Sequence, residues 1–195
     1  MLLSSTELHR YDVKATDGLI GTVQDIYFDD GTWKLQYFIV ETSGFLRHRT
    51  IHVPIDSVQG LEFPEEALML RLAKSQLEAE PGKDIGVHLQ SANQLAGYAV
   101  SASDGPIGTV HGLLIETASW SVRYVVVNAE QCSPTRLILL APHAIHSIHR
   151  DNASMLVNSS SRQVLAAPEY NGQAELSRDW ESFLHDHYGW PPYWL

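Results

Sequence analysis

The stretch that decides the fold runs from Asp17 to Phe28, Asp-Gly-Leu-Ile-Gly-Thr-Val-Gln-Asp-Ile-Tyr-Phe. It returns between Asp104 and Ile115 as Asp-Gly-Pro-Ile-Gly-Thr-Val-His-Gly-Leu-Leu-Ile. A shift of 87 residues aligns residues 4–81 with residues 91–168 without a gap. Solenoid repeats are about 20–50 residues long, so a repeat of this length is a small domain. The sequence therefore predicts a tandem duplication.

The repeated stretch has the pattern of a bent strand that follows a turn. Asp-Gly is a turn dipeptide because glycine adopts a positive φ without strain. The apolar side chains that follow include a step of three, from Val23 to Ile26 and from Val110 to Leu113. That step breaks the period of two and predicts a β-bulge. Gly21 and Gly108 fit a strand that turns a barrel corner.

Further short strands follow at regular spacing in both copies. Trp33–Glu41 and Trp120–Asn128 are rich in aromatic and β-branched residues, and Val53-Pro54 and Ala141-Pro142 come next. This succession resembles the PRC-barrel family, and the resemblance covers both copies. It implies an all-β chain of two tandem small PRC-type β-barrels. It also implies use as an assembly module, as in the cytoplasmic domain of the photosynthetic reaction-centre H subunit.

Four segments are expected along the chain. Residues 1–80 form the first barrel repeat, residues 81–90 a breaker-rich linker, and residues 91–168 the second repeat. Residues 169–195 have no counterpart in the first copy. Within the repeats we expect strands over 8–13 and 95–100, a loop over 44–49, and a linker that begins near Lys74.

The C-terminal tail combines an amphipathic helix with an extended aromatic segment. Apolar side chains between Leu176 and His187 recur at helical spacing, and Gly189 is a natural helix stop. Exposed aromatic area is costly in water, so the tail packs on something. Either it folds back on its own barrels or a sister subunit, or it docks a partner. The predicted partner-binding residues are Trp180, Phe183, Leu184, Tyr188, Trp190, Tyr193 and Trp194.

Composition narrows the function classes. The net charge is −10, with an excess of acidic residues over residues 1–88 and again in the tail, so direct nucleic-acid binding is not expected. Cys132 is the single cysteine, which fits a reducing compartment, and we predict a cytoplasmic protein. No apolar run reaches the length of a membrane span.

Candidate chemical groups are sparse. Ten histidines include His143, His146 and His149, but their spacing of three suits neither a helix face nor a strand face, and no metal or other cofactor is predicted. Asp17 and Asp104 are interpreted as turn caps. The acidic patch at residues 25, 29 and 30 has no full counterpart in the second copy. Nucleophile-elbow and phosphate-loop patterns are absent, so we predict no enzyme.

The leading hypothesis is a non-catalytic PRC-barrel protein that acts in protein–protein interaction or assembly. We expect a homodimer, since small domains of this size are marginally stable alone. The alternatives are a small-ligand or metal-binding carrier, and an accessory factor of the ribosome-maturation type.

Overall fold

A computed structural model describes residues 1–42, 49–78, 88–132, 135–172 and 176–194. Its contacts divide the chain into two compact units. The N-terminal unit comprises Ser5–Asn93 and Ser119–Ser121, and the C-terminal unit comprises Met1–Ser4, Gln94–Ala118 and Val122–Leu195. The predicted loop over 44–49 and the predicted linker over 81–90 fall mostly outside the described residues.

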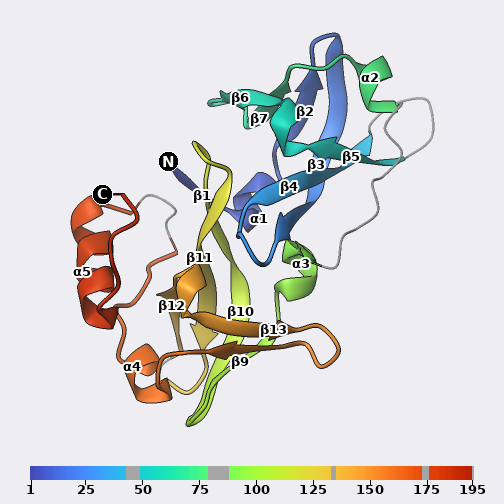
Figure 1. The fold of residues 1–195 in the computed structure, drawn as a ribbon. Helices are drawn as coiled ribbons and strands as arrows, with labels where there is room; N and C mark the ends of the chain where they lie inside the picture. Colours follow the sequence, from blue (N-terminus) through green and yellow to red (C-terminus); the bar gives the residue numbers. More distant parts are fainter. Residues whose placement is uncertain (43–48, 79–87, 133–134, 173–175, 195) are drawn as a thin grey trace. The chain divides into compact units, whose positions relative to one another are not determined.

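The N-terminal unit contains one mixed sheet, labelled in Figure 1. Its neighbouring strands pair antiparallel except β2 and β7, which are parallel. The strand order is β5 (Thr50–Pro54), β4 (Leu35–Thr42), β3 (Gly18–Asp29), β2 (Asp12–Ala15), β7 (Ala67–Leu70) and β6 (Val58–Glu62).

The C-terminal unit repeats this sheet strand for strand. Here β9 and β14 form the parallel pair. The order is β12 (Arg136–Leu140), β11 (Ser121–Ala129), β10 (Gly105–Glu116), β9 (Ala99–Ala102), β14 (Ser154–Val157) and β13 (Ile145–His149). The chain is thus mostly β and contains two similar mixed sheets, as the duplication predicted.

A seventh strand in each sheet comes from the other copy. β1 (Leu2–Ser4) pairs with β10 of the C-terminal unit, whereas its equivalent β8 (Leu89–Ser91) pairs with β3 of the N-terminal unit. The registers correspond residue by residue, because Leu3 faces Ile115 and Gln90 faces Phe28. The two copies therefore exchange their first strands reciprocally, which the sequence analysis did not predict.

Short helices connect the strands at equivalent places. α1 (Ser5–Leu8) follows β1 as α3 (Ala92–Leu95) follows β8, and a 3-10 turn, η1 (Ile55–Ser57) or η2 (Pro142–Ala144), precedes β6 or β13. α2 (Lys74–Glu78) and α4 (Ser161–Leu165) close the repeats, and α5 (Arg178–Tyr188) follows in the tail.

These helices correct two strand predictions. The segments 8–13 and 95–100 are not continuous strands, because Leu8 and Leu95 end one-turn helices and the strands begin only at Asp12 and Ala99. Both leucines are fully buried, so an apolar residue at the end of a helical turn imitated the start of an apolar strand. The segment that begins at Lys74 is helical as far as Glu78 rather than an open linker.

The predicted bulge and barrel corner are confirmed. The β3–β4 register shifts between Val23 and Asp25, so that the apolar step of three keeps both Val23 and Ile26 fully buried. A Cβ atom on Gly21 would lie 1.8 Å from the carbonyl oxygen of Glu41. The equivalent atom on Gly108 would lie 1.8 Å from that of Asn128. Only glycine permits two strands to cross so closely at these corners.

Candidate functional site

The helix predicted in the tail is present as α5. Ser177 caps its first turn, since the Ser177 hydroxyl accepts a hydrogen bond from the Trp180 amide at 3.2 Å. Gly189 ends the helix in the left-handed conformation, with φ of 71°. The glycine stop confirms the predicted end of the helix. The polar N-cap, which the sequence analysis did not identify, defines its start.

After Gly189 the chain turns back along α5 toward its first turn (Figure 1). The Trp190 amide donates to the His185 carbonyl at 2.9 Å, and the Tyr193 hydroxyl donates to Glu181 Oε1 at 2.7 Å. Tyr188 and Trp190 stack with their ring centroids 3.9 Å apart. The aromatic tail therefore packs on its own unit in this structure.

Glu181 is the centre of the tail contacts. It is 2% exposed, and its Oε1 atom accepts hydrogen bonds from the hydroxyls of Tyr124, at 3.0 Å, and Tyr193, at 2.7 Å. Its Oε2 atom forms an ion pair with Arg178 at 2.9 Å. A buried carboxylate is tolerated when its oxygens are paired in this way. Glu181 thus joins the barrel strand β11, the helix α5 and the tail.

The tyrosines around Glu181 resist ionisation. Burial and the Glu181 charge raise the pKa of Tyr193 to about 12. The same two causes, burial first, raise the pKa of Tyr124 far above its ordinary value. Both phenols therefore remain protonated at physiological pH, and each keeps the proton that it donates to Glu181.

Two guanidinium groups cover the tail rings. Arg123 lies 4.4 Å from the centroid of the Tyr193 ring, and Arg178 lies 4.5 Å from that of Trp194. Arg123 also forms a 2.5 Å ion pair with Glu116. Cation–π contacts of this kind stabilise an exposed ring by about 0.5–1 kcal/mol. They add to the hydrogen bonds that hold the tail.

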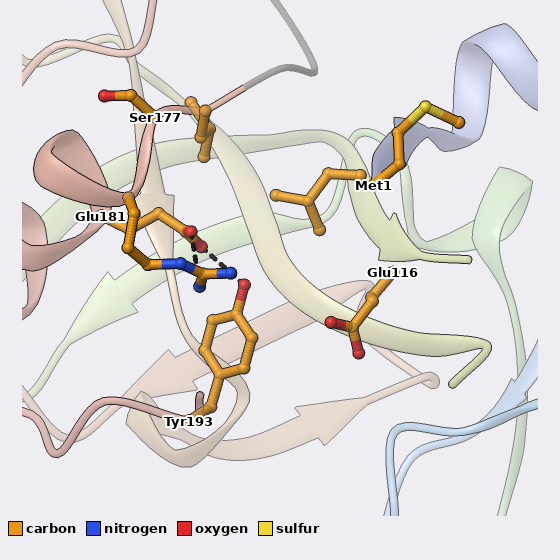
Figure 2. A pocket seen from close by; sticks show the side chains of 8 residues that line it. Met1, Glu116, Ser177, Glu181 and Tyr193 are labelled. Carbon is orange, nitrogen blue, oxygen red and sulfur yellow. Dashed lines mark hydrogen bonds and ion pairs between the residues drawn. The ribbon is translucent and has the colours of Figure 1, made fainter. Parts of the chain in front are cut away.

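A pocket of about 500 Å³ opens beside this network. Glu181 and Ser177 lie on one side of it, and Met1 and Glu116 on the opposite side (Figure 2). Leu2 and Leu176 add apolar surface. The carboxylates in the lining are paired with arginines, so the pocket combines balanced charge with apolar area.

The predicted partner-binding residues fall into three groups by exposure. Leu184 and Tyr188 are buried, and Phe183 is exposed at 62%. The other four are half-buried, namely Trp180, Trp190, Tyr193 and Trp194. The surface of the tail that a second molecule can reach is therefore centred on Phe183.

Sequence reasoning did not predict that three further residues belong to this site. Tyr124, Glu181 and His185 are all buried and connect the tail to the barrel. Tyr124 was included only as a member of the predicted strand Trp120–Asn128. One usable signal was the polar pair Glu181 and His185, four residues apart and therefore on one face of α5. Polar residues at that spacing on the buried face of an amphipathic helix need hydrogen-bond partners in the element on which the helix packs.

The repeated aspartates cap helices rather than their own turns. Asp17 Oδ1 accepts a hydrogen bond from the Lys74 amide at 3.0 Å, and Asp104 Oδ1 accepts one from the Ser161 amide at 2.7 Å. The Ser161 amide is the first cause that lowers the pKa of Asp104. The capping role was predicted correctly, but the amides belong to α2 and α4, far away in the sequence.

Two carboxylates of the acidic patch in the first copy, Asp25 and Asp29, accept structural hydrogen bonds. Asp25 accepts hydrogen bonds from Ser91 and from two backbone amides, and Asp29 holds the turn at Thr32. Hydrogen bonds from Thr32 lower the pKa of Asp29. Among the described residues, no group of three or more metal-ligating side chains gathers at one place. Nor does that part of the chain contain a helix long and apolar enough to cross a membrane.

Comparison with known families identifies the first repeat. Residues 3–77 match the model of the PRC-barrel domain, whereas a comparison with curated proteins finds no match. The matched range contains strands β2 to β7, helix α1 and the last two residues of β1. The second sheet repeats its strand order and its parallel pair. The chain therefore contains a PRC-barrel domain over residues 3–77, followed by a second sheet with the same strand order.

Proposed function

We propose that this PRC-barrel protein is a non-catalytic assembly module that binds a protein partner through the outer face of α5 and the adjoining tail. The observation that carries the proposal is the exposure of Phe183. Its side chain is 62% exposed on a helix whose opposite face buries Leu184 and Tyr188. Aromatic side chains are enriched among the residues that dominate binding energy.

The charges around Phe183 indicate the chemistry of the partner. Asp179 and Asp186 lie four residues before and three residues after Phe183, so they share its face of the helix, and both are exposed. The tail as a whole has one basic and five acidic side chains. We infer a partner with an apolar pocket bordered by lysine or arginine residues, because opposite charges at an interface favour association and fix its register.

Photo-crosslinking from position 183 tests this proposal. The full chain carries benzoyl-phenylalanine in place of Phe183 and is irradiated in native lysate. We expect a discrete crosslinked protein, which is then purified to measure its affinity for the unmodified chain. Phe183→Ala should weaken that affinity at least about tenfold, the range of an interface hot spot.

Two matched variants give the controls. Leu19→Ala removes an apolar side chain that is 45% exposed in the N-terminal unit, and it should leave the affinity unchanged. The double substitution Asp179→Lys and Asp186→Lys should abolish binding through charge repulsion. Equal affinities of F183A and L19A for the crosslinked protein would refute the proposed surface. A crosslink to a second copy would identify the partner as the expected homodimer.

The pocket favours a second candidate function, a carrier of a small amphiphilic molecule. Its volume of about 500 Å³ lies within the range of small-ligand sites, and its lining combines paired charges with Met1, Leu2 and Leu176. Native mass spectrometry of the purified full chain tests this candidate. A bound small molecule that Leu176→Trp displaces would support it, and an unloaded mass for the freshly purified chain would count against it.

The compartment is also part of the proposal. We place the protein in the cytoplasm because its single cysteine suits a reducing environment. The acidic composition speaks against a role that requires direct contact with RNA, which is why the ribosome-maturation alternative ranks lower.

A further inference from the structure

The turn between β6 and β7 of the N-terminal unit (Figure 1) exposes an aromatic side chain. Phe63 is 50% exposed, and Pro64 beside it is exposed as well. The Phe63 ring packs edge to face on the buried ring of Tyr11, with the two centroids 6.2 Å apart. The far end of the turn is held by the Asp12 amide, which donates to the Glu66 carbonyl at 2.9 Å. The hairpin therefore presents Phe63 in a defined position.

Carboxylates lie close to this ring. Glu65 and Glu66 complete the turn, and both are exposed. Burial raises the pKa of Tyr11, and the charges of Glu66 and Glu7 raise it further, so these two carboxylates lie near the ring on which Phe63 packs. Among the residues that the structure describes, no ion pair engages the carboxylate of Glu65 or Glu66. The turn thus combines an apolar centre with negative charge.

Two basic side chains lie among these carboxylates. Lys14 Nζ on β2 forms an ion pair with Glu62 Oε2 at 2.8 Å. This contact raises the pKa of Lys14, and the charges of Glu65 and Asp12 raise it further. Arg10, next to Tyr11 in the chain, is exposed. Against these two basic side chains stand five acidic ones, namely Glu7, Asp12, Glu62, Glu65 and Glu66.

The equivalent turn of the second copy has the same backbone with a different surface. Between β13 and β14, Arg150 stands where the first copy has Phe63. Glu66 and its equivalent Ala153 adopt φ of 49° and 48°. Their carbonyls each accept a hydrogen bond at 2.9 Å, from the first residue of β2 and of β9. The geometry of the turn therefore requires neither the aromatic ring nor the glutamate.

None of the five acidic side chains has an acidic equivalent in the second copy, whereas the buried Tyr11 corresponds to Tyr98. An exposed aromatic ring and adjacent carboxylates each cost stability in water, and the second copy forms its turn without them. A function other than folding therefore explains the composition of the first turn. The residues at the five equivalent positions are Gln94, Ala99, His149, Asn152 and Ala153.

We propose that residues 62–66, bordered by Glu7 and Asp12, form a second docking surface, which binds a lysine- or arginine-rich segment of a partner protein with an apolar side chain opposite Phe63. Charge complementarity selects this occupant, because the acidic border attracts a basic segment and repels nucleic-acid phosphates and anionic lipid surfaces. The proposal does not depend on docking at Phe183, since it uses residues of the N-terminal unit alone.

A library of displayed random 12-residue peptides tests this surface. The library is selected on the full chain and counter-selected on the triple variant Phe63→Arg, Glu65→Asn and Glu66→Ala, which we expect to fold because the second copy has these residues on the same backbone. The selected peptides should contain several lysine or arginine residues and a large apolar residue. They should bind the variant at least about tenfold more weakly. A selection that yields no such peptides, or peptides that bind both chains equally, would overturn the proposal.

Single and double variants separate the apolar contribution from the charged one. Phe63→Ala should weaken binding of the selected peptides about tenfold and leave its salt dependence unchanged. The double substitution Glu65→Gln and Glu66→Gln keeps the ring and should reduce both the affinity and its salt dependence. Asn152→Ala, in the equivalent turn of the second copy, is the matched control and should change neither quantity. A loss of affinity in N152A as large as in F63A would contradict the assignment.

Amide chemical shifts of the wild-type chain locate the bound peptide without any substitution. Titration with a selected peptide should shift the resonances of residues 62–67 and leave those of residues 149–154 in place. Shifts confined to α5 would refute the second surface and assign the peptides to the surface around Phe183. Phe183→Ala should leave peptide binding unchanged, so a failed crosslink from position 183 and a failed titration here refute different proposals.

Discussion

The two copies treat one equivalent tyrosine differently. Tyr37 on β4 is half-buried, with its ring 6.2 Å from His52. Tyr124, its counterpart on β11, is fully buried and bonded to Glu181 and His185. The strands are the same, and the difference is the tail, which is attached only to the second copy. The additional helix α5 thus packs on the second copy and forms hydrogen bonds with a tyrosine of its sheet.

The comparison shows which features belong to the repeat and which were added. Corner glycines, helix-capping aspartates and the exchanged first strands occur in both copies with the same partners. Even the backbone conformation repeats, since Trp33 and Trp120 both adopt a positive φ, of 57° and 48°. The Glu181 network occurs only in the C-terminal unit. Equivalent substitutions of a repeated feature should therefore have similar effects in the two sheets. A substitution in the Glu181 network should affect only the C-terminal unit.

The largest effect is expected at the barrel corners. Gly21→Ala and Gly108→Ala each place a Cβ atom 1.8 Å from a backbone oxygen, which forces the strands apart. We expect each to lower the free energy of unfolding by at least about 3 kcal/mol, measured by urea denaturation. Gly60→Ala, where a Cβ would meet nothing within 4 Å, is the control. If only one of the two alanine variants lost stability, the two corners would not be structurally equivalent.

The next largest effect is expected at Glu181. Glu181→Ala leaves the hydroxyls of Tyr124 and Tyr193 buried without their acceptor and leaves Arg178 without its carboxylate. The expected loss is about 3 kcal/mol, confined to the C-terminal unit. Hydrogen exchange, read separately for peptides of each unit, locates the loss. Equal deprotection of both units would show that the tail supports the whole chain.

A pair of Tyr→Phe substitutions measures how much more the hydroxyl of Tyr124 contributes to stability than that of Tyr37. Tyr124→Phe removes a buried hydroxyl with two partners and should cost about 1–2 kcal/mol. Tyr37→Phe changes a half-buried side chain and should cost less than about 0.5 kcal/mol. Thermal unfolding of both variants gives the difference. If the two costs were equal, the tail contacts of Tyr124 would contribute nothing net.

The smallest effect is expected at the helix caps. The Ser161 amide lowers the pKa of Asp104, so the cap stabilises α4 above the ordinary value of 3.8 and loses this contribution as the pH falls through the lowered pKa. Asp104→Asn should remove this pH dependence from the protection of the Ser161 amide in hydrogen exchange. A pH dependence that persists in D104N would assign it to another group.

Much of the fold could be predicted because local signals and the repeat agreed. The step of three in the apolar pattern indicated the bulge. The four consecutive apolar residues 137–140 favoured a strand covered on both faces, and the last three of them are fully buried, whereas Leu137 is half-buried. The C-terminal end of α5 followed from Gly189, whose stop role depends on neighbours a few residues away. Leu8 and Leu95 misled because one apolar residue fits a helical turn as well as a strand.

The amino-acid sequence by itself determined the duplication, the strand periods, the corner glycines and the stop of the tail helix at Gly189, because each depends on residues that are close in the chain or on the match between copies. Only the tertiary structure decided that the first strands are exchanged and that Tyr124, Glu181 and His185 meet. Strands pair through backbone N–H and C=O groups, which are nearly independent of residue type. The sequence therefore does not indicate which strand β1 or β8 pairs with. A buried polar network likewise depends on three-dimensional closure, which no local pattern encodes.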